Sequence, residues 1–247
     1  MIKFFRKIRQ GLLTQNKFSK YLLYALGEII LVVIGILIAL QINNWNEDRK
    51  TLKEEKATIA SLKLEFQKNL IDLEFDMNNV GAFINAGNVL LDHTGPDYTE
   101  GTLEKVDSLI AMTFKMSVWD PSLYTLSNIK NSGKLSKLSN NDLKELLIEW
   151  ESFYSNLLSW HDFYISGGKK YFEYLEKHGI VKNLNSSGPF GYGISNFEGS
   201  NEELLKLKSY ENVLVNRVFQ NRFILRFYND AKQLQLEIIK ECETYED

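Results

Sequence analysis

The sequence "GEIILVVIGILIAL", residues 27–40, is a long apolar stretch, and it determines how the chain is divided into parts. Apolar residues extend it on both sides to residues 22–42, and Glu28 is the one acid among them. At a rise of 1.5 Å per residue, about 21 helical residues cross a hydrocarbon core of roughly 30 Å. The sequence therefore predicts a transmembrane helix over residues 21–45.

The segment before this helix is strongly basic. Residues 1–20 contain no acid and six cations, namely Lys3, Arg6, Lys7, Arg9, Lys17 and Lys20. The whole chain has a net charge of −3, so the residues after 20 carry about −9. The positive-inside bias keeps the basic end in the cytoplasm and places residues 46–247 on the other side of the membrane. The alternative is a secretory signal peptide, but no A-x-A-like site follows the apolar run, and we expect a retained anchor.

Residues 1–20 also have an amphipathic pattern. Ile2, Phe5, Ile8 and Leu12 recur at helical spacing among the cations, as in a short helix that lies on an anionic membrane surface. Nucleic-acid binding is the alternative interpretation of these charges. A single basic arm beside a membrane anchor is better explained by lipid headgroups, so we expect membrane lipid as a partner and no nucleic acid.

The chain after the anchor is predicted to be helical almost throughout, and it begins with a long stalk helix over about residues 46–93. Apolar residues in this range are spaced mostly by three or four: Leu52, Ile59, Leu62, Phe66, Leu70, Leu73, Met77, Val80 and Ile84. One apolar seam along a helix has this spacing. The stalk helix continues the transmembrane helix and ends at the "HTGP" of residues 93–96.

Shorter helices are predicted next. One covers about residues 102–116. Another begins with Asp120 as N-cap and Pro121 at the first helical position, and it ends at Gly133. Aspartate accepts hydrogen bonds from the first backbone N–H groups of a helix, and proline lacks an N–H that would need a partner there.

Two long helices complete the chain. The first covers residues 139–179, with an interruption or bend at the two glycines of residues 167–168. The second begins at a capping box formed by Ser200 and Glu203 and runs to about residue 242. The predicted fold class is all-α, with a single N-terminal transmembrane helix continuing into the stalk helix of an elongated antiparallel helical bundle. Its three parts are a basic cytoplasmic segment (1–20), a transmembrane anchor (21–45) and an extracytoplasmic helical domain (46–247).

Three stretches resemble a known family: "MIKFFRKIRQ" at residues 1–10, "GEIILVVIGILIALQINNWNEDRK" at 27–50, and "SLYTLSNIKNSGKLSKLSNNDLKELL" at 122–147. They are similar to an uncharacterised bacterial family of single-pass membrane proteins, a family of unknown function. The resemblance implies an inner-membrane protein with a helical periplasmic domain. It implies no activity, substrate or catalytic residue.

One stripe of the anchor is a candidate helix–helix contact, formed at helical spacing by Glu28, Val32, Gly35, Ala39 and Ile42. Gly35 and Ala39 form a small-xxx-small pair, which lets a second helix approach closely. A charge in the membrane is costly, so we expect Glu28 to be neutralised by hydrogen bonding in this contact. The alternatives are a proton-carrying acid, as in stator-type energising complexes, and a side chain that reaches the interface without any partner.

The loop "NSSGPFGYGISNFEG", residues 185–199, combines glycines with Phe190, Tyr192 and Phe197. We expect a compact loop that folds its aromatic rings over the end of the bundle. The alternative is a surface that binds a partner or a sugar.

Motifs for catalysis and metal binding are not found in the sequence. Its three histidines form no H-x-x-x-H pair, its single cysteine, Cys242, excludes a thiolate cluster, and neither G-x-S-x-G nor a P-loop occurs. Ser127 and Lys130 match S-x-x-K, but no K-T-G follows. The aromatic residues of the range 150–164 have the spacing of a stripe that faces the core or an interface. We therefore expect a protein that is not an enzyme and that uses no cofactor or metal.

Three hypotheses of function follow. The first is a structural or assembly subunit of a membrane complex, which associates with itself or with another integral membrane protein through the Glu28 stripe. The second is a proton-coupled stator-type component, which requires Glu28 to titrate. The third is a ligand-sensing helical bundle, which would need a partner to transmit its signal because only about twenty residues precede the anchor. The sequence favours the first.

Overall fold

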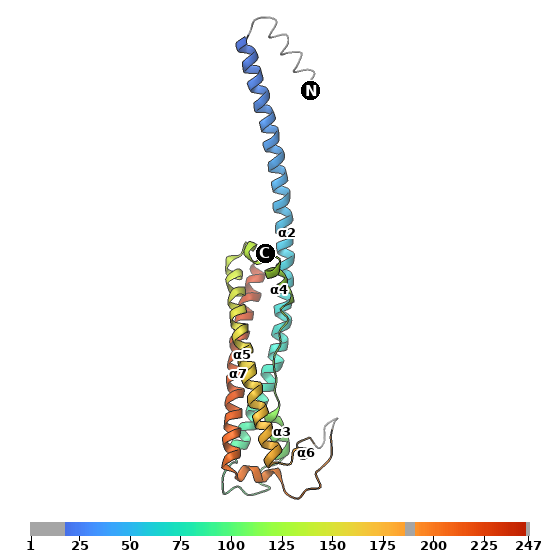
Figure 1. The fold of residues 1–247 in the computed structure, drawn as a ribbon, viewed down its shortest axis with the longest axis vertical. Helices are drawn as coiled ribbons and strands as arrows, with labels where there is room; N and C mark the ends of the chain where they lie inside the picture. Colours follow the sequence, from blue (N-terminus) through green and yellow to red (C-terminus); the bar gives the residue numbers. More distant parts are fainter. Residues whose placement is uncertain (1–17, 186–190, 246–247) are drawn as a thin grey trace. The chain divides into compact units, whose positions relative to one another are not determined.

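A computed structural model gives the fold of residues 18–185 and 191–245 (Figure 1). The described residues form helices and connecting segments without any strand. They divide into two compact units, one that ends at Ala57 and one that begins at Thr58. The predicted all-α class is confirmed.

The first unit consists of the beginning of helix α2, which runs without interruption over Phe18–Leu91. Every Leu, Ile and Val between residues 22 and 42 is at least 47% exposed, so the apolar side chains cover all faces of this stretch. At its C-terminal end, the guanidinium carbon of Arg49 lies 5.7 Å from the centre of the Trp45 ring. This helix, near the N-terminus, is long and apolar enough to span a membrane.

The second unit is a helical bundle in which the rest of α2 lies beside two long helices, α5 and α7 (Figure 1). Helices α5 and α7 run in opposite directions and pack closely along their length. The elements after α2 are α3 (Val106–Phe114), α4 (Tyr124–Asn131), the short helix η1 (Leu135–Lys137), α5 (Asn141–His178), α6 (Val181–Leu184), the short helix η2 (Asn201–Lys206) and α7 (Lys208–Thr244).

The core of this unit consists of two buried clusters, and the larger one lies between α2, α5 and α7. The predicted seam of α2 supplies Ile59, Leu62, Phe66, Leu73 and Val80, all at most 1% exposed. These residues pack with Trp150 of α5 and Tyr228 of α7, and with the buried Trp119 of the segment between α3 and α4. Leu52, at the start of the predicted seam, belongs to the first unit and is 49% exposed, so the seam contributes to the bundle only from Ile59 onward.

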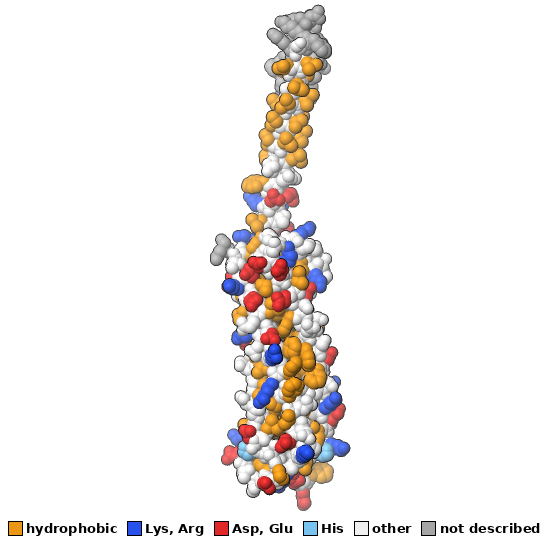
Figure 2. Space-filling model, turned by 90° about the vertical axis from the view of Figure 1, so that its left-hand side faces the viewer, with side chains coloured by type: hydrophobic (Ala, Val, Ile, Leu, Met, Phe, Trp, Pro, Cys, Tyr) orange, Lys and Arg blue, Asp and Glu red, His pale blue; other side chains and the backbone are white. Residues whose placement is uncertain are grey.

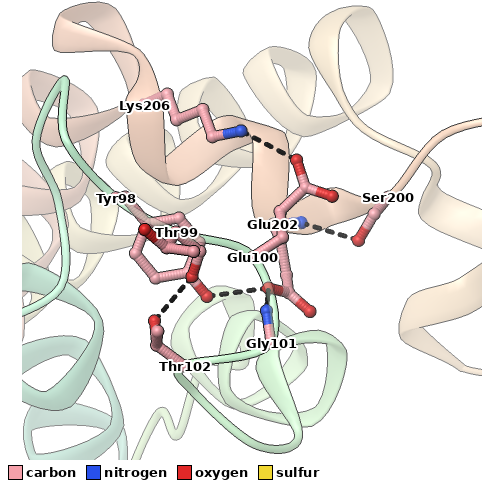
Figure 3. A network of polar contacts seen from close by, with 8 residues as sticks. All are labelled: Tyr98, Thr99, Glu100, Gly101, Thr102, Ser200, Glu202 and Lys206. Carbon is pink, nitrogen blue, oxygen red and sulfur yellow. Dashed lines mark hydrogen bonds and ion pairs between the residues drawn. The ribbon is translucent and has the colours of Figure 1, made fainter.

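Polar contacts hold the end of the bundle where α2 ends and α7 begins (Figure 3). The Glu202 carboxylate in η2 accepts hydrogen bonds from the Tyr98 hydroxyl (2.8 Å) and from the backbone N–H of Gly101 (2.6 Å). Beside it, Lys206 forms an ion pair with Glu100 at 2.8 Å. Because one carboxylate satisfies two donors, the turn after α2 is fixed against η2.

Three predicted helix starts are wrong, because other groups satisfy the backbone there. Asp120 and Pro121 do not begin a helix: they lie in an extended segment, and α4 starts at Tyr124. Ser200 accepts a hydrogen bond from the N–H of Glu202 at 3.1 Å and therefore caps η2, whereas α7 starts only at Lys208. Helix α5 begins after Asn140 rather than Ser139, because the Asn140 side chain accepts from the N–H of Leu143 at 2.9 Å.

The sequence predicts an interruption or bend at residues 167–168, and the structure has no interruption there, since α5 is helical throughout. A Cβ at Gly167 would lie 2.1 Å from the amide of Gln220 in α7, and one at Gly168 would lie 2.5 Å from the Met116 sulfur. The two glycines therefore allow neighbouring side chains to approach α5 closely.

Candidate functional site

The predicted stripe of the anchor lies on one face of the first part of α2. Val32 and Ile42 are 56% and 61% exposed. No atom outside the local backbone lies within 4 Å of the position of a Cβ at Gly35, so the surface beside it is open to a second helix. Contact of this face with another helix, and the roles of Glu28 and Ala39 in it, stay predictions.

Sequence reasoning missed another feature, an extended segment that packs against the bundle with every second side chain buried. We call residues 115–123, between α3 and α4, the connector; they have no helical hydrogen bonds, yet Trp119 is only 1% exposed. Backbone N–H and C=O groups that are removed from water require hydrogen-bond partners. In the bundle, polar side chains of α2 and α7 supply these partners.

Arg217 of α7 binds the start of the connector. Its side chain is 1% exposed and donates to the carbonyl oxygens of Thr113 at 3.0 Å and Lys115 at 2.8 Å. A third bond goes to the carbonyl of Tyr164 in α5 at 3.4 Å, and the guanidinium carbon lies 4.5 Å from the centre of the Tyr164 ring. Burial lowers the pKa of Arg217 from its ordinary value, while the neighbouring Tyr164 opposes this shift. The planar guanidinium thereby joins three segments.

Tyr228 of α7 binds the middle of the connector. Its hydroxyl accepts from the backbone N–H of Trp119 at 2.9 Å and donates to the carbonyl of Ser117 at 3.1 Å. The Nε2 atom of His161 in α5 lies 3.1 Å from the same hydroxyl. Because the Tyr228 hydroxyl donates its proton to the Ser117 carbonyl, it can only accept from His161. This geometry fits a neutral His161 that carries its proton on Nε2.

Helix α2 binds the connector from the other side. The amide of Asn69 donates to the carbonyl of Ser122 and accepts from its N–H, both at 2.8 Å, as a paired strand residue would. Asn69 also accepts from the Trp119 indole N–H through its own backbone carbonyl at 3.2 Å. Glu65 accepts from the N–H of Thr125 at 2.7 Å and so caps α4 from a different helix. This distant cap explains why Asp120 is not needed as the N-cap.

Comparison with known families gives one match. The sequence matches the family described as "Family of unknown function (DUF6090)" over residues 28–174, which is more than half of its length. The chain belongs to the DUF6090 family. The DUF6090 match begins at Glu28, includes the connector and ends within α5, so Arg217 and Tyr228 of α7 lie beyond it. Neither a curated protein nor a solved structure matches the chain.

The remaining predicted residues are placed as follows. Lys3, Arg6, Lys7, Arg9 and Lys17 lie outside the described residues; Lys20 is in α2, but its side chain is outside them. Of the candidate loop, Phe190 lies outside the described residues. Tyr192 and Phe197 are 72% and 84% exposed, so the expectation that these two rings fold over the bundle is wrong.

Among the described residues, no group of three His, Cys, Asp or Glu side chains is arranged to hold a metal ion.

The burial of His161 is expected to make the stability of the bundle dependent on pH. Burial lowers its pKa below the ordinary 6.5, although Asp120, Asp162 and Asp76 oppose the shift. The unfolded chain therefore binds a proton at a higher pH than the folded chain does. Above the pKa of His161 in the unfolded chain, about 6.5, the neutral side chain makes its full contribution to the free energy of unfolding. As the pH falls below this value, the free energy of unfolding decreases by at most about 1.4 kcal/mol for each pH unit.

We expect the urea midpoint of the full-length protein in detergent to fall between pH 7.5 and pH 5.5, and to fall less in His161→Gln. Glutamine retains a hydrogen-bonding side chain beside Tyr228 but does not titrate. Equal losses in the two proteins would show that His161 does not cause this dependence.

Proposed function

We propose that the chain is a non-enzymatic, single-pass membrane protein that serves as a structural or assembly subunit of a bacterial inner-membrane complex. Residues 21–45 cross the membrane, the basic N-terminus remains in the cytoplasm, and the helical bundle lies in the periplasm. Copies of the chain associate with each other, or with another integral membrane protein, through the stripe of Glu28, Gly35 and Ala39.

The observation that carries this proposal is the exposure of the apolar residues of the first unit. A helix whose Leu, Ile and Val side chains are all at least 47% exposed over residues 22–42 is suited to lipid and not to water. Trp45 lies beyond the end of this stretch, with Arg49 beside its ring, as is common at a membrane–water interface. The six cations that precede the helix support the cytoplasmic placement of the N-terminus.

The association is tested with two tagged copies of the full-length chain, expressed together and purified through one tag in mild detergent. Gly35→Leu is expected to lower the recovery of the second tag about tenfold, because leucine fills the surface through which the second helix approaches. Gly27→Leu is the matched control, since residue 27 lies about 100° from residue 28 around the helix, outside the stripe.

If the contact is with another membrane protein, the same substitution removes that protein from the purified sample. Equal recovery from Gly35→Leu and Gly27→Leu would contradict the assigned stripe. Absence of any associated chain from the wild-type protein would contradict the proposed function itself.

A further inference from the structure

A small pocket lies between α4 and α5 on the surface of the bundle. Its volume is about 250 Å³, and five of its nine lining side chains are polar. Leu126, Ser127 and Lys130 line it from α4, and Glu151 and Ser155 line it from α5. Pockets for drug-sized ligands have about 300–1,000 Å³ and are mostly apolar, so this pocket suits a smaller and more polar molecule.

The polar groups of the pocket offer both donors and acceptors without a net charge. Lys130 donates to both carboxylate oxygens of Glu151 at 2.9 Å, which joins α4 to α5. An ammonium group has three N–H donors and a carboxylate has about four lone pairs, so each partner can bind a further group. The hydroxyls of Ser127 and Ser155 are exposed, and neither has a hydrogen-bond partner within the described chain.

The aromatic side of the pocket is rigid and contains an unused donor. Trp150 is fully buried, and its indole N–H has no hydrogen-bond partner among the described residues. The Tyr154 ring stacks on it with 6.4 Å between the ring centres, and the Tyr154 hydroxyl donates to Asp120 at 3.3 Å. Because a buried donor without a partner is destabilising, an acceptor that reaches Trp150 would be bound favourably.

The pocket differs in chemistry from an apolar groove between α5 and α7. That groove is lined by Trp160, Phe163, Phe219 and Phe223, with Ser159 as its one polar lining residue. Figure 2, which looks onto this side of the bundle, shows hydrophobic side chains gathered over its middle part. A polar ligand would lose its hydrogen bonds to water in such a groove, whereas the pocket between α4 and α5 replaces them.

We propose that the pocket between α4 and α5 binds a neutral pyranose sugar. Neighbouring hydroxyls of such a ring donate to Glu151 and accept from Lys130, and the apolar C–H groups of the ring pack on the leucines of the wall, Leu126 and the half-exposed Leu158. A charged ligand of either sign is disfavoured, because it meets its own charge in the ion pair. An acetamido group on the ring adds a carbonyl acceptor for the Trp150 N–H. This inference goes beyond the proposed function and does not depend on what the anchor contacts.

The test is a titration of the full-length protein with N-acetylglucosamine, in a detergent whose headgroup is not a sugar. The protein carries ¹⁵N in its tryptophan indoles, and replacement of each tryptophan by phenylalanine assigns the four N–H resonances. The Trp150 resonance is expected to move downfield and to saturate, because its N–H gains an acceptor, while that of Trp45 in the anchor stays unchanged. The dissociation constant is expected on the order of 1 mM for a ligand of about fifteen non-hydrogen atoms.

Two substitutions in the pocket are compared with two matched controls. Ser155→Leu fills the pocket and Glu151→Gln removes the charged acceptor, so each is expected to raise the dissociation constant at least tenfold. Ser166→Leu, at an exposed position of α5 outside the pocket, and Glu100→Gln, which removes the exposed ion pair with Lys206, are expected to leave it unchanged. Circular dichroism shows whether each variant is folded.

Three results would overturn the inference while the proposed function stands. The first is a Trp150 resonance that does not move at about 10 mM N-acetylglucosamine, ten times the expected dissociation constant. The second is a shift that folded Ser155→Leu retains with unchanged affinity, because the sugar would then bind elsewhere. The third is an equal shift with sorbitol, an open-chain polyol, because the pocket would then not recognise a sugar ring.

Discussion

Replacement of Arg217 by methionine is expected to lower the free energy of unfolding of the bundle by about 2–4 kcal/mol. The substitution leaves the carbonyl groups of Thr113, Lys115 and Tyr164 without their donor. Each buried polar group that loses its partner costs about 1–3 kcal/mol. The loss is partly offset, because burial already disfavours the Arg217 charge, as its lowered pKa indicates. Methionine keeps the length and apolar volume of the side chain, so the effect reports the hydrogen bonds.

The measurement is urea unfolding of the full-length protein in detergent, followed by circular dichroism. Arg226→Met is the control, because Arg226 lies on the exposed side of the same helix, and its replacement is expected to change stability by no more than about 0.5 kcal/mol. Lysine at position 217 is expected to recover only part of the loss, since an ammonium group cannot reach three acceptors as a guanidinium fork does. Equal stability of Arg217→Met and Arg226→Met would show that the connector does not depend on Arg217.

The helices themselves were predictable because their signals are local. The apolar seam that begins at Ile59 has the spacing of one helical face, and "HTGP" marks the end of α2 within two residues of its observed end at Leu91. The aromatic residues of α5 were expected in the core or in an interface; Trp150 and Tyr164 are at most 1% exposed, whereas Phe163 is 46% exposed. Periodicity alone suffices for such features, because burial on one face repeats every three or four residues.

The connector was not predictable, because its stabilisation comes from residues far away in the sequence. Asp120 and Pro121 are typical of a helix start, yet Glu65 caps α4 and Asn69 pairs with Ser122 from α2, more than fifty residues earlier. The partners of the connector on α7 were missed for a related reason. Arg217 and Tyr228 alternate with apolar residues on the buried face, and a search for apolar periodicity passes over a buried arginine.

The long apolar helix over residues 22–42 was predictable, since a run of apolar residues of this length follows from composition alone. What the anchor binds depends on a second molecule, and no pattern within one chain identifies that molecule. The groove between α5 and α7 was also hidden in the sequence. Phe219 and Phe223 have helical spacing like core residues, and only the packed bundle shows that they lie on its outside.

The central claim is that residues 21–45 are retained as a membrane-spanning helix and that the bundle lies on the side opposite the basic N-terminus. This claim predicts an all-or-none labelling result. Asp72→Cys is exposed on the part of α2 that belongs to the bundle, whereas the native Cys242 is buried and serves as the blank. A maleimide that cannot cross membranes should therefore react with the thiol introduced at position 72 in intact spheroplasts, before any lysis.

The most direct test combines this labelling with the mass of the labelled chain in the carbonate-washed membrane fraction. The account predicts a chain that keeps residues 1–45, remains in the membrane fraction and is fully labelled from outside. A labelled chain that begins after residue 45, or an Asp72→Cys variant that reacts only once the spheroplasts are lysed, would contradict the account.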